Sequence, residues 1–418
     1  MRTPTTEADN VRNEDRPAGE LPPCPFAVVA PTPFYTPGGC SARILGEIEG
    51  LAETHRPPTT FTYGTGTDLP GIPVVRSGPS VRGLTTGFHW SRPGLDLLLS
   101  RTLLAYRDLP ATLHVHLYEG GLIGKVVRQL RGIPYVVDLQ GSLVEESARY
   151  AKAGFGRWAA HRLARIERLV EDGAGYVVTS SPSMLEFVRT HSPEVAERLV
   201  CVDDGVPARA VLTPSERDRA RTKSRESFGD AAEDFVIAYL GSLSRSQGID
   251  SVLEAAPSIL RSVPNARFRL FGVPNPGSSI EQYRAMAGRL GVGDRVQFPG
   301  AVPYDDATRT LAGADVAVTW KANPFEANGK VPFYMGAGVP TVALRTPIAE
   351  HYLGRDGSKG GVVAASVDAA IDGVVRLAHE PSSRQKLGEA ALATARAELT
   401  WSARAARLLN LHRNLVGS

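Results

Sequence analysis

Short apolar runs alternate with longer amphipathic stretches along most of the chain. In the first half this pattern predicts buried strands at 26–30, 113–117, 135–139 and 176–179. Helical stretches follow those strands, at 41–53, at 121–130, up to about 171, and at 182–189. Strands that alternate with helices in this way are typical of a parallel, doubly wound α/β sheet.

The alternation stops over the polar, charged segment 206–232, which we interpret as a linker, and then restarts. The second half predicts strands at 235–240, 267–271, 296–298, 316–318 and 340–344. Its predicted helices lie at 249–261, 279–290, 305–312, 330–337, 367–377 and 382–415.

The pattern therefore predicts two Rossmann-like, doubly wound domains, at 24–205 and 233–395, facing a central cleft. We expect the helix in 396–418 to cross back to the first domain. The polar, Pro-rich residues 1–23 are predicted to be a disordered tail. Ligands of open α/β sheets bind beyond the carboxyl ends of the strands, so the cleft is where chemistry is expected.

Composition narrows the class of protein without naming a reaction. A net charge of +3 over 418 residues is too small to argue for nucleic acid, and the arginines are dispersed without interleaved aromatic residues. Cys24, Cys40 and Cys201 are odd in number and widely spaced, so they predict neither a disulfide framework nor a zinc site. No apolar run could form a signal peptide or a membrane span, which favours a cytoplasmic protein.

Several polar residues follow the strands of the first domain. Gly38 and Gly39 stand between a strand and a helix, where backbone N–H groups can approach an anion, although a simple tight turn reads the same way. His114 and His116 share one face of a strand, and His116 is better placed to reach the cleft. Glu119 lies where a catalytic carboxylate could act, and the segment 138–142 could bind a hydroxylated ligand or cap a helix.

In the second domain the most informative stretch is 325–340. A loop that contains Glu326, Asn328 and Gly329 leads into a predicted helix that begins near Lys330. The unpaired N–H groups of that helix and the lysine could meet a diphosphate.

This stretch resembles the nucleotide-binding motif of retaining GT-B glycosyltransferases of the family 4 type, which often reads K-x-x-E-Y-M-A-A-G-x-P-x-V-A. Here it reads KVPFYMGAGVPTVA over residues 330–343. Further segments are similar to family motifs in the same order, at 31–43, 113–119, 239–250 and 296–302. The resemblance covers roughly residues 24–415.

The resemblance implies roles for individual residues. Catalysis is assigned to His116, with Glu326 holding sugar hydroxyls, and we add Glu119 as a candidate. Donor binding is assigned to Gly38, Gly39, Gln140, Ser242, Arg245, Gln247, Gly272, Pro299, Asn328, Gly329, Lys330 and Val331.

The sequence also departs from the family pattern. Phe333 stands where members usually carry a glutamate that hydrogen-bonds the donor ribose, and a phenylalanine cannot accept such a bond. Ser242 and Gln247 stand where an arginine and a lysine are common. Arg245 lies between them and, with Lys330, could supply the two cations that a diphosphate needs.

The implied activity is transfer of a sugar, with retention, from a UDP- or GDP-sugar to a small-molecule acceptor. The biased composition suits an actinobacterial-type genome, and the resemblance to enzymes of such genomes implies a place in antibiotic or other secondary-metabolite biosynthesis. No strand-terminal D-x-D motif occurs, so neither a metal nor a separate cofactor is expected. Alternatives are a lipid or exopolysaccharide acceptor, a nucleotide-sugar epimerase of this fold, and a non-catalytic homologue that only binds the nucleotide sugar.

Partners other than substrates are not expected, apart from a homodimer, which the sequence leaves open. The segment 155–169 places four arginines among Trp158, Leu163 and Ile166, and a basic amphipathic helix can lie on anionic lipid. More often such a helix packs its apolar side on the sheet and solvates its charges. We therefore expect no membrane contact and no nucleic acid.

Overall fold

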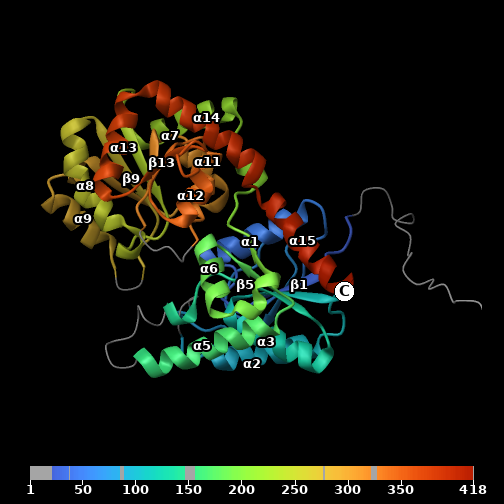
Figure 1. The fold of residues 1–418 in the computed structure, drawn as a ribbon. Helices are drawn as coiled ribbons and strands as arrows, with labels where there is room; N and C mark the ends of the chain where they lie inside the picture. The colour runs from blue at the N-terminus through green and yellow to red at the C-terminus, as the bar shows by residue number, and fades with distance from the viewer. Residues whose placement is uncertain are drawn as a thin grey trace, which may run out of the picture.

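The computed structural model describes residues 21–36, 38–84, 89–145, 156–275, 278–321 and 327–417. It contains two parallel sheets, one in each of two lobes (Figure 1). Most of the predicted disordered tail, residues 1–20, lies outside the described residues, and so does Glu326.

The first lobe is built on a seven-stranded parallel sheet in the order β3-β2-β1-β4-β5-β6-β7. Its strands are β1 (Phe26–Ala30), β2 (Thr60–Tyr63), β3 (Val74–Ser77), β4 (Thr112–His116), β5 (Tyr135–Leu139), β6 (Tyr176–Thr179) and β7 (Leu199–Cys201). The hydrophobic pattern predicts β1, β4, β5 and β6. It misses β2, β3 and β7: β2 alternates threonines with aromatic residues, β3 has only two consecutive apolar residues, and β7 is three residues long.

Helices cover both faces of this sheet (Figure 1). They are α1 (Gly39–Ala52), α2 (Arg92–Ala105), α3 (Leu117–Arg131), α5 (Gly156–Gly173) and α6 (Pro182–His191). Successive strand residues point to opposite faces. Ala27 and Val29 of β1 accordingly pack in a core with α2, α3 and α5, whereas Phe26 and Val28 pack with α1 and the last helix of the chain.

The second lobe has a six-stranded sheet in the order β10-β9-β8-β11-β12-β13. Its strands are β8 (Phe235–Leu240), β9 (Ala266–Phe271), β10 (Val296–Gly300), β11 (Val316–Thr319), β12 (Thr341–Leu344) and β13 (Gly361–Ala364). Its helices are α7 (Pro214–Phe228), α8 (Ile249–Ser262), α9 (Ile280–Arg289), α10 (Ala307–Leu311), α11 (Lys330–Gly336), α12 (Pro347–Leu353), α13 (Val367–His379) and α14 (Pro381–Glu398).

The segment 206–232, expected to be a linker, contains helix α7. The helix shows no apolar period because Ser224 is its only residue buried in the described structure. A capping box between Thr213 and Glu216 holds its first turn, and two of its arginines pair with Asp315 at 2.7 and 2.5 Å. The segment is therefore mostly a helix of the second lobe.

The predicted final helix, 382–415, is two helices, α14 and α15 (Trp401–Gly417). They meet where Thr400 forms a bridge with Val206, close to the point where the chain first passes between the lobes. Helix α15 returns to the first lobe and packs on α1. A Cβ at Gly50 would lie 2.4 Å from the Trp401 carbonyl oxygen, so glycine permits this close packing. Among the described helices, none is long and apolar enough to span a bilayer.

Candidate functional site

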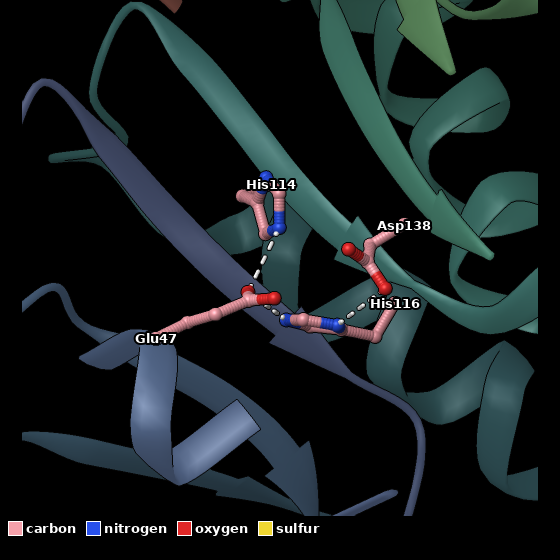
Figure 2. A group of neighbouring side chains, drawn as sticks. All are labelled: Glu47, His114, His116 and Asp138. Carbon is pink, nitrogen blue, oxygen red and sulfur yellow. Dashed lines mark ion pairs between the residues drawn. The ribbon is translucent and has the colours of Figure 1, made fainter. Parts of the chain in front are cut away.

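Helix α1 and the carboxyl ends of β4 and β5 meet in a buried group of ionisable side chains (Figure 2). Glu47 Oε2 lies 3.2 Å from His114 Nε2 and 3.5 Å from His116 Nε2. His116 Nδ1 lies 3.8 Å from Asp138 Oδ1. All four side chains are at most 2% exposed. Because β4 and β5 pair His116 with Asp138, the parallel register itself brings these two residues together.

Arg43, one helical turn before Glu47, holds this group together. Its guanidinium donates to both Asp138 oxygens at 3.0 and 2.5 Å, and to Asp204 Oδ1 at 2.9 Å. It also lies 3.1 Å from Glu47 Oε1. Burial by itself would raise the pKa of Asp138, but Arg43 and His116 hold that pKa well below its usual range. The single buried guanidinium of Arg43 thus pairs with three carboxylates.

Asp204 extends this network to the second lobe. Its backbone carbonyl accepts a hydrogen bond of 3.1 Å from the Tyr352 hydroxyl of α12. A Cβ at Gly329, just before α11, would lie 2.8 Å from Asp204 Oδ2. The loop that carries the predicted donor-binding residues therefore lies directly against the Arg43 network.

His116 is placed differently from the sequence expectation that it reaches the cleft. Its side chain has no exposed surface, and Gln140 Nε2 lies 3.5 Å from its Nδ1 on the side away from Glu47. A ligand could meet the ring only after neighbouring groups move. The next residue, Leu117, has a φ of 65°, a left-handed conformation that a bulky residue rarely adopts and that is often stored at functional sites.

The remaining predicted residues of the first lobe are more open. Gly39 begins α1, and a Cβ built at Gly38 or Gly39 meets nothing within 4 Å. Glu119 stands in the first turn of α3, is 26% exposed, and lies 3.3 Å from Arg92 Nη2. The N-terminus of α1 thus leaves room for an anion to approach the backbone.

In the second lobe, the structure brings Lys330 and Gln247 together from segments 83 residues apart. Lys330 is the first residue of α11, and its Nζ donates to Gln247 Oε1 at 2.8 Å. The ammonium also lies 4.9 Å from the centre of the Tyr239 ring. Gly241, directly after β8, is so close that a Cβ there would lie 3.0 Å from Lys330 Cε.

Other predicted donor residues divide into exposed and structural ones. Arg245 is 90% exposed and lies 3.7 Å from Asp250, and Ser242 and Pro299 are also exposed. Pro299 lies inside β10 rather than in the expected loop. The exposed group is therefore free to meet a ligand at this sheet edge.

The structural group fixes the loops around Lys330. Gly272 has a φ of 136°, and a Cβ there would lie 1.8 Å from the Gly241 carbonyl oxygen. The side-chain amide of Asn328 is buried against Thr319 Oγ1 at 3.1 and 3.2 Å, and Val331 is fully buried. These residues shape the site and are not open to a ligand in this structure.

Phe333, at the position of the usual glutamate, belongs to the apolar core. It is 7% exposed and its ring packs edge-on against Tyr304 at 5.2 Å. Phe333 therefore offers no hydrogen-bond acceptor at this position.

The sequence analysis missed the roles of Arg43, Glu47 and Asp204. The first two gave a usable indication, since two opposite charges four residues apart lie on one face of a helix that is otherwise mostly apolar. Asp204 gave none, because its partner lies 161 positions away.

Within the described residues, one set of side chains has metal-ligand spacing. Glu47, His114, His116 and Asp138 each offer a ligand atom within 4.8 Å of the others. The Arg43 guanidinium already pairs with two of these four groups, and a divalent cation would be placed beside it at a large electrostatic cost. We assign no metal to the cluster.

Each lobe matches a known protein-family model. Residues 38–205 match the family model described as a glycosyl transferase 4-like domain, and residues 220–394 match glycosyl transferases group 1. Among curated proteins, D-inositol 3-phosphate glycosyltransferase of Corynebacterium glutamicum is 25% identical over 73% of this chain and 72% of its own. That of Streptosporangium roseum is 27% identical over 90% of this chain and 88% of its own.

Solved structures share the fold at lower identity. Sucrose-phosphate synthase from Thermosynechococcus elongatus aligns with a TM-score of 0.76 at 17% identity, covering 94% of this chain and 99% of that one. The Anabaena protein HepE in complex with UDP and glucose aligns with a TM-score of 0.73 at 16% identity, over 93% and 99%.

Proposed function

Because this chain belongs to the GT-B glycosyltransferases that join a 4-like domain to a group 1 domain, we propose that it transfers a sugar from a nucleotide diphosphate sugar to a small hydroxylated acceptor. The observation that carries this proposal is Lys330. Its ammonium is positioned beside Gly241 and Gln247 at the carboxyl edge of the second sheet. That edge is where open α/β sheets bind ligands.

We propose UDP as the first nucleotide to test. HepE, whose fold this chain shares, is described in complex with UDP. The diphosphate would be met by Lys330 and by Arg245, which is exposed enough to turn towards it. The backbone at Gly38 and Gly39 would add N–H donors from the first lobe.

The proposed reaction proceeds with retention. The bond between the anomeric carbon and the diphosphate oxygen breaks as the acceptor oxygen bonds to the same face. The acceptor proton passes to the departing diphosphate. Lys330 and Arg245 stabilise the negative charge that develops on that diphosphate, without a metal in this proposal. His116, Glu119 and Glu326 remain our candidates for contacts to the sugar.

For the acceptor we propose a cyclitol or other small polyol, free or phosphorylated, as the class to test first. The relatives found here are named D-inositol 3-phosphate glycosyltransferases, and their similarity spans both lobes. A small-molecule acceptor agrees with the composition-based expectation. The antibiotic setting has no support beyond that composition.

Product analysis tests the proposal directly. The chain is incubated with UDP-glucose, UDP-N-acetylglucosamine or GDP-mannose, with and without inositol phosphate or free polyols. UDP release that depends on the acceptor, with the donor's anomeric configuration kept in the product by NMR, is expected. Conversion of the donor sugar without acceptor would show an epimerase. Donor binding in a thermal-shift assay without any turnover across the acceptor panel would show a non-catalytic homologue.

A further inference from the structure

The outer face of the first lobe exposes an unusual number of apolar side chains. In the described residues, ten large hydrophobic residues are exposed, and seven of them lie on or next to α2, α3 and α5. The seven are Trp90, Leu97, Leu98, Leu122, Val126, Leu130 and Leu169. Trp90 is 82% exposed, Leu97 71% and Leu130 69%. Scattered single leucines are ordinary, but a concentration on one face indicates an interaction surface.

These three helices form one layer. They cover the same side of the seven-stranded sheet, away from α1 and α15 (Figure 1). On α3, Leu122, Val126 and Leu130 are four residues apart and therefore form a single stripe. Side chains exposed on neighbouring helices of one layer face the same solvent, so the seven residues present a common outer face.

This outer face is also strongly basic, although the whole chain is nearly neutral. Its exposed or half-buried cations are Arg101, Lys125, Arg128, Arg131, Arg162, Arg165 and Arg168. The acidic residues of the same helices are mostly turned inward: Glu167 and Glu171 are buried, and Asp96 and Glu119 are held by Tyr63 and Arg92. In the described parts of the three helices, Asp172 alone is an exposed acid.

We propose that the outer face of α2, α3 and α5 docks on an anionic lipid surface. Exposed leucines and a tryptophan would enter the headgroup boundary, and the arginines would remain at the level of the anionic headgroups. This proposal revises the expectation, drawn from the α5 sequence alone, that the helix makes no membrane contact.

Charge and composition distinguish this occupant from two others. A second copy of the chain would bring the same basic face against itself, which like charges oppose. A nucleic acid would leave the exposed leucines unpartnered, and a single strand would find Trp90 as the one exposed aromatic residue for base stacking on or next to the described parts of these helices.

Vesicle co-sedimentation of the full chain tests the proposal. We expect binding to vesicles of equal parts phosphatidylglycerol and phosphatidylcholine, little binding to pure phosphatidylcholine, and weaker binding as salt is raised. A double variant, Leu97→Gln with Leu130→Gln, and another, Arg101→Glu with Arg165→Glu, should each weaken the partition by about tenfold or more. All four side chains are exposed, and thermal melts verify that the variants remain folded.

Matched changes on the second lobe serve as controls. Val273→Gln alters an apolar residue that is 56% exposed, and Arg261→Glu with Arg376→Glu reverses two exposed charges. Both should bind anionic vesicles as the unaltered chain does. The proposal is overturned if the unaltered chain ignores anionic vesicles, or if the two lobes' variants weaken binding equally. It is also overturned if light scattering shows that the exposed leucines instead mediate self-association.

Discussion

The carboxyl ends of the two sheets are topologically alike, yet they hold their charges in opposite ways. In the first lobe, Arg43, Glu47 and Asp138 are buried and bonded to one another. In the second, Lys330 is held by a neutral amide, and Arg245 is almost fully exposed. A buried cation that is fully paired with carboxylates gains little from an arriving anion, whereas an exposed one such as Arg245 can turn towards it. The first sheet edge is therefore held by buried ion pairs, and the second carries the cations that we propose bind a diphosphate.

Among the variants that test this comparison, Arg43→Met is expected to have the largest effect on stability. The variant leaves Glu47, Asp138 and Asp204 buried around a neutral side chain. We expect a loss of about 3–5 kcal/mol in the free energy of unfolding, because an uncompensated buried charge is costly. Urea denaturation measures it, and Arg245→Met is the control, with an unchanged midpoint. A loss below about 1 kcal/mol would mean that the network is not structural.

Lys330→Ala should have the opposite consequence, with a large loss of activity and little loss of stability. It leaves stability nearly unchanged but removes the cation nearest to the proposed diphosphate. We expect kcat to fall by about 100-fold, the usual result of deleting one group that stabilises developing negative charge. The matched control is Gln247→Ala, which removes one hydrogen-bond partner of the lysine and keeps the charge. Its activity should stay within about tenfold of the unaltered chain. Equal losses in both variants would contradict our assignment of the charge to Lys330.

The two sheet edges also differ in how much of each could be predicted from the sequence. Lys330 and Gln247 are found by motif because each lies at a fixed offset from a strand or helix boundary. The Arg43 network depends instead on contacts between residues 95 and 161 positions apart. The central strands of both sheets are predicted from their apolar runs, whereas β2 and β3 lack such a run and β7 has only three residues. Helix α7 is missed because its stability comes from caps and ion pairs rather than an apolar face.

Two glycines sharpen the comparison further. Gly329→Ala places a methyl group 2.8 Å from Asp204 Oδ2, on a carboxylate whose other oxygen, Oδ1, accepts a hydrogen bond from Arg43. We expect a loss of about 1–3 kcal/mol from this overpacking. Gly39→Ala places its methyl in open space, so stability should not change. If the backbone there meets the donor or acceptor, the KM of that substrate rises. Unaltered KM values in Gly39→Ala would remove the GG loop from the binding site.

The smallest effect concerns pH and again belongs to the first lobe. Burial raises the pKa of Asp96 from 3.8 to about 6, although its oxygen accepts a hydrogen bond of 2.5 Å from the Tyr63 hydroxyl. Between pH 4 and 6 the folded chain therefore keeps a proton that the unfolded chain has released. The contribution of Asp96 to stability is present below pH 4 and is lost as the pH rises through 6, opposite to the usual behaviour of an ion-paired aspartate.

Asp96→Asn should accordingly gain stability relative to the unaltered chain as the pH rises from 4 to 7, measured by urea denaturation at each pH. Tyr63→Phe provides the second arm. It removes the hydrogen bond that favours the ionised carboxylate, so the fall in stability should move to higher pH. The contrary result is a difference in stability between Asp96→Asn and the unaltered chain that is the same at every pH. That result would show that the Asp96 carboxyl group is as well solvated as the exposed acids and does not belong to the buried part of α2.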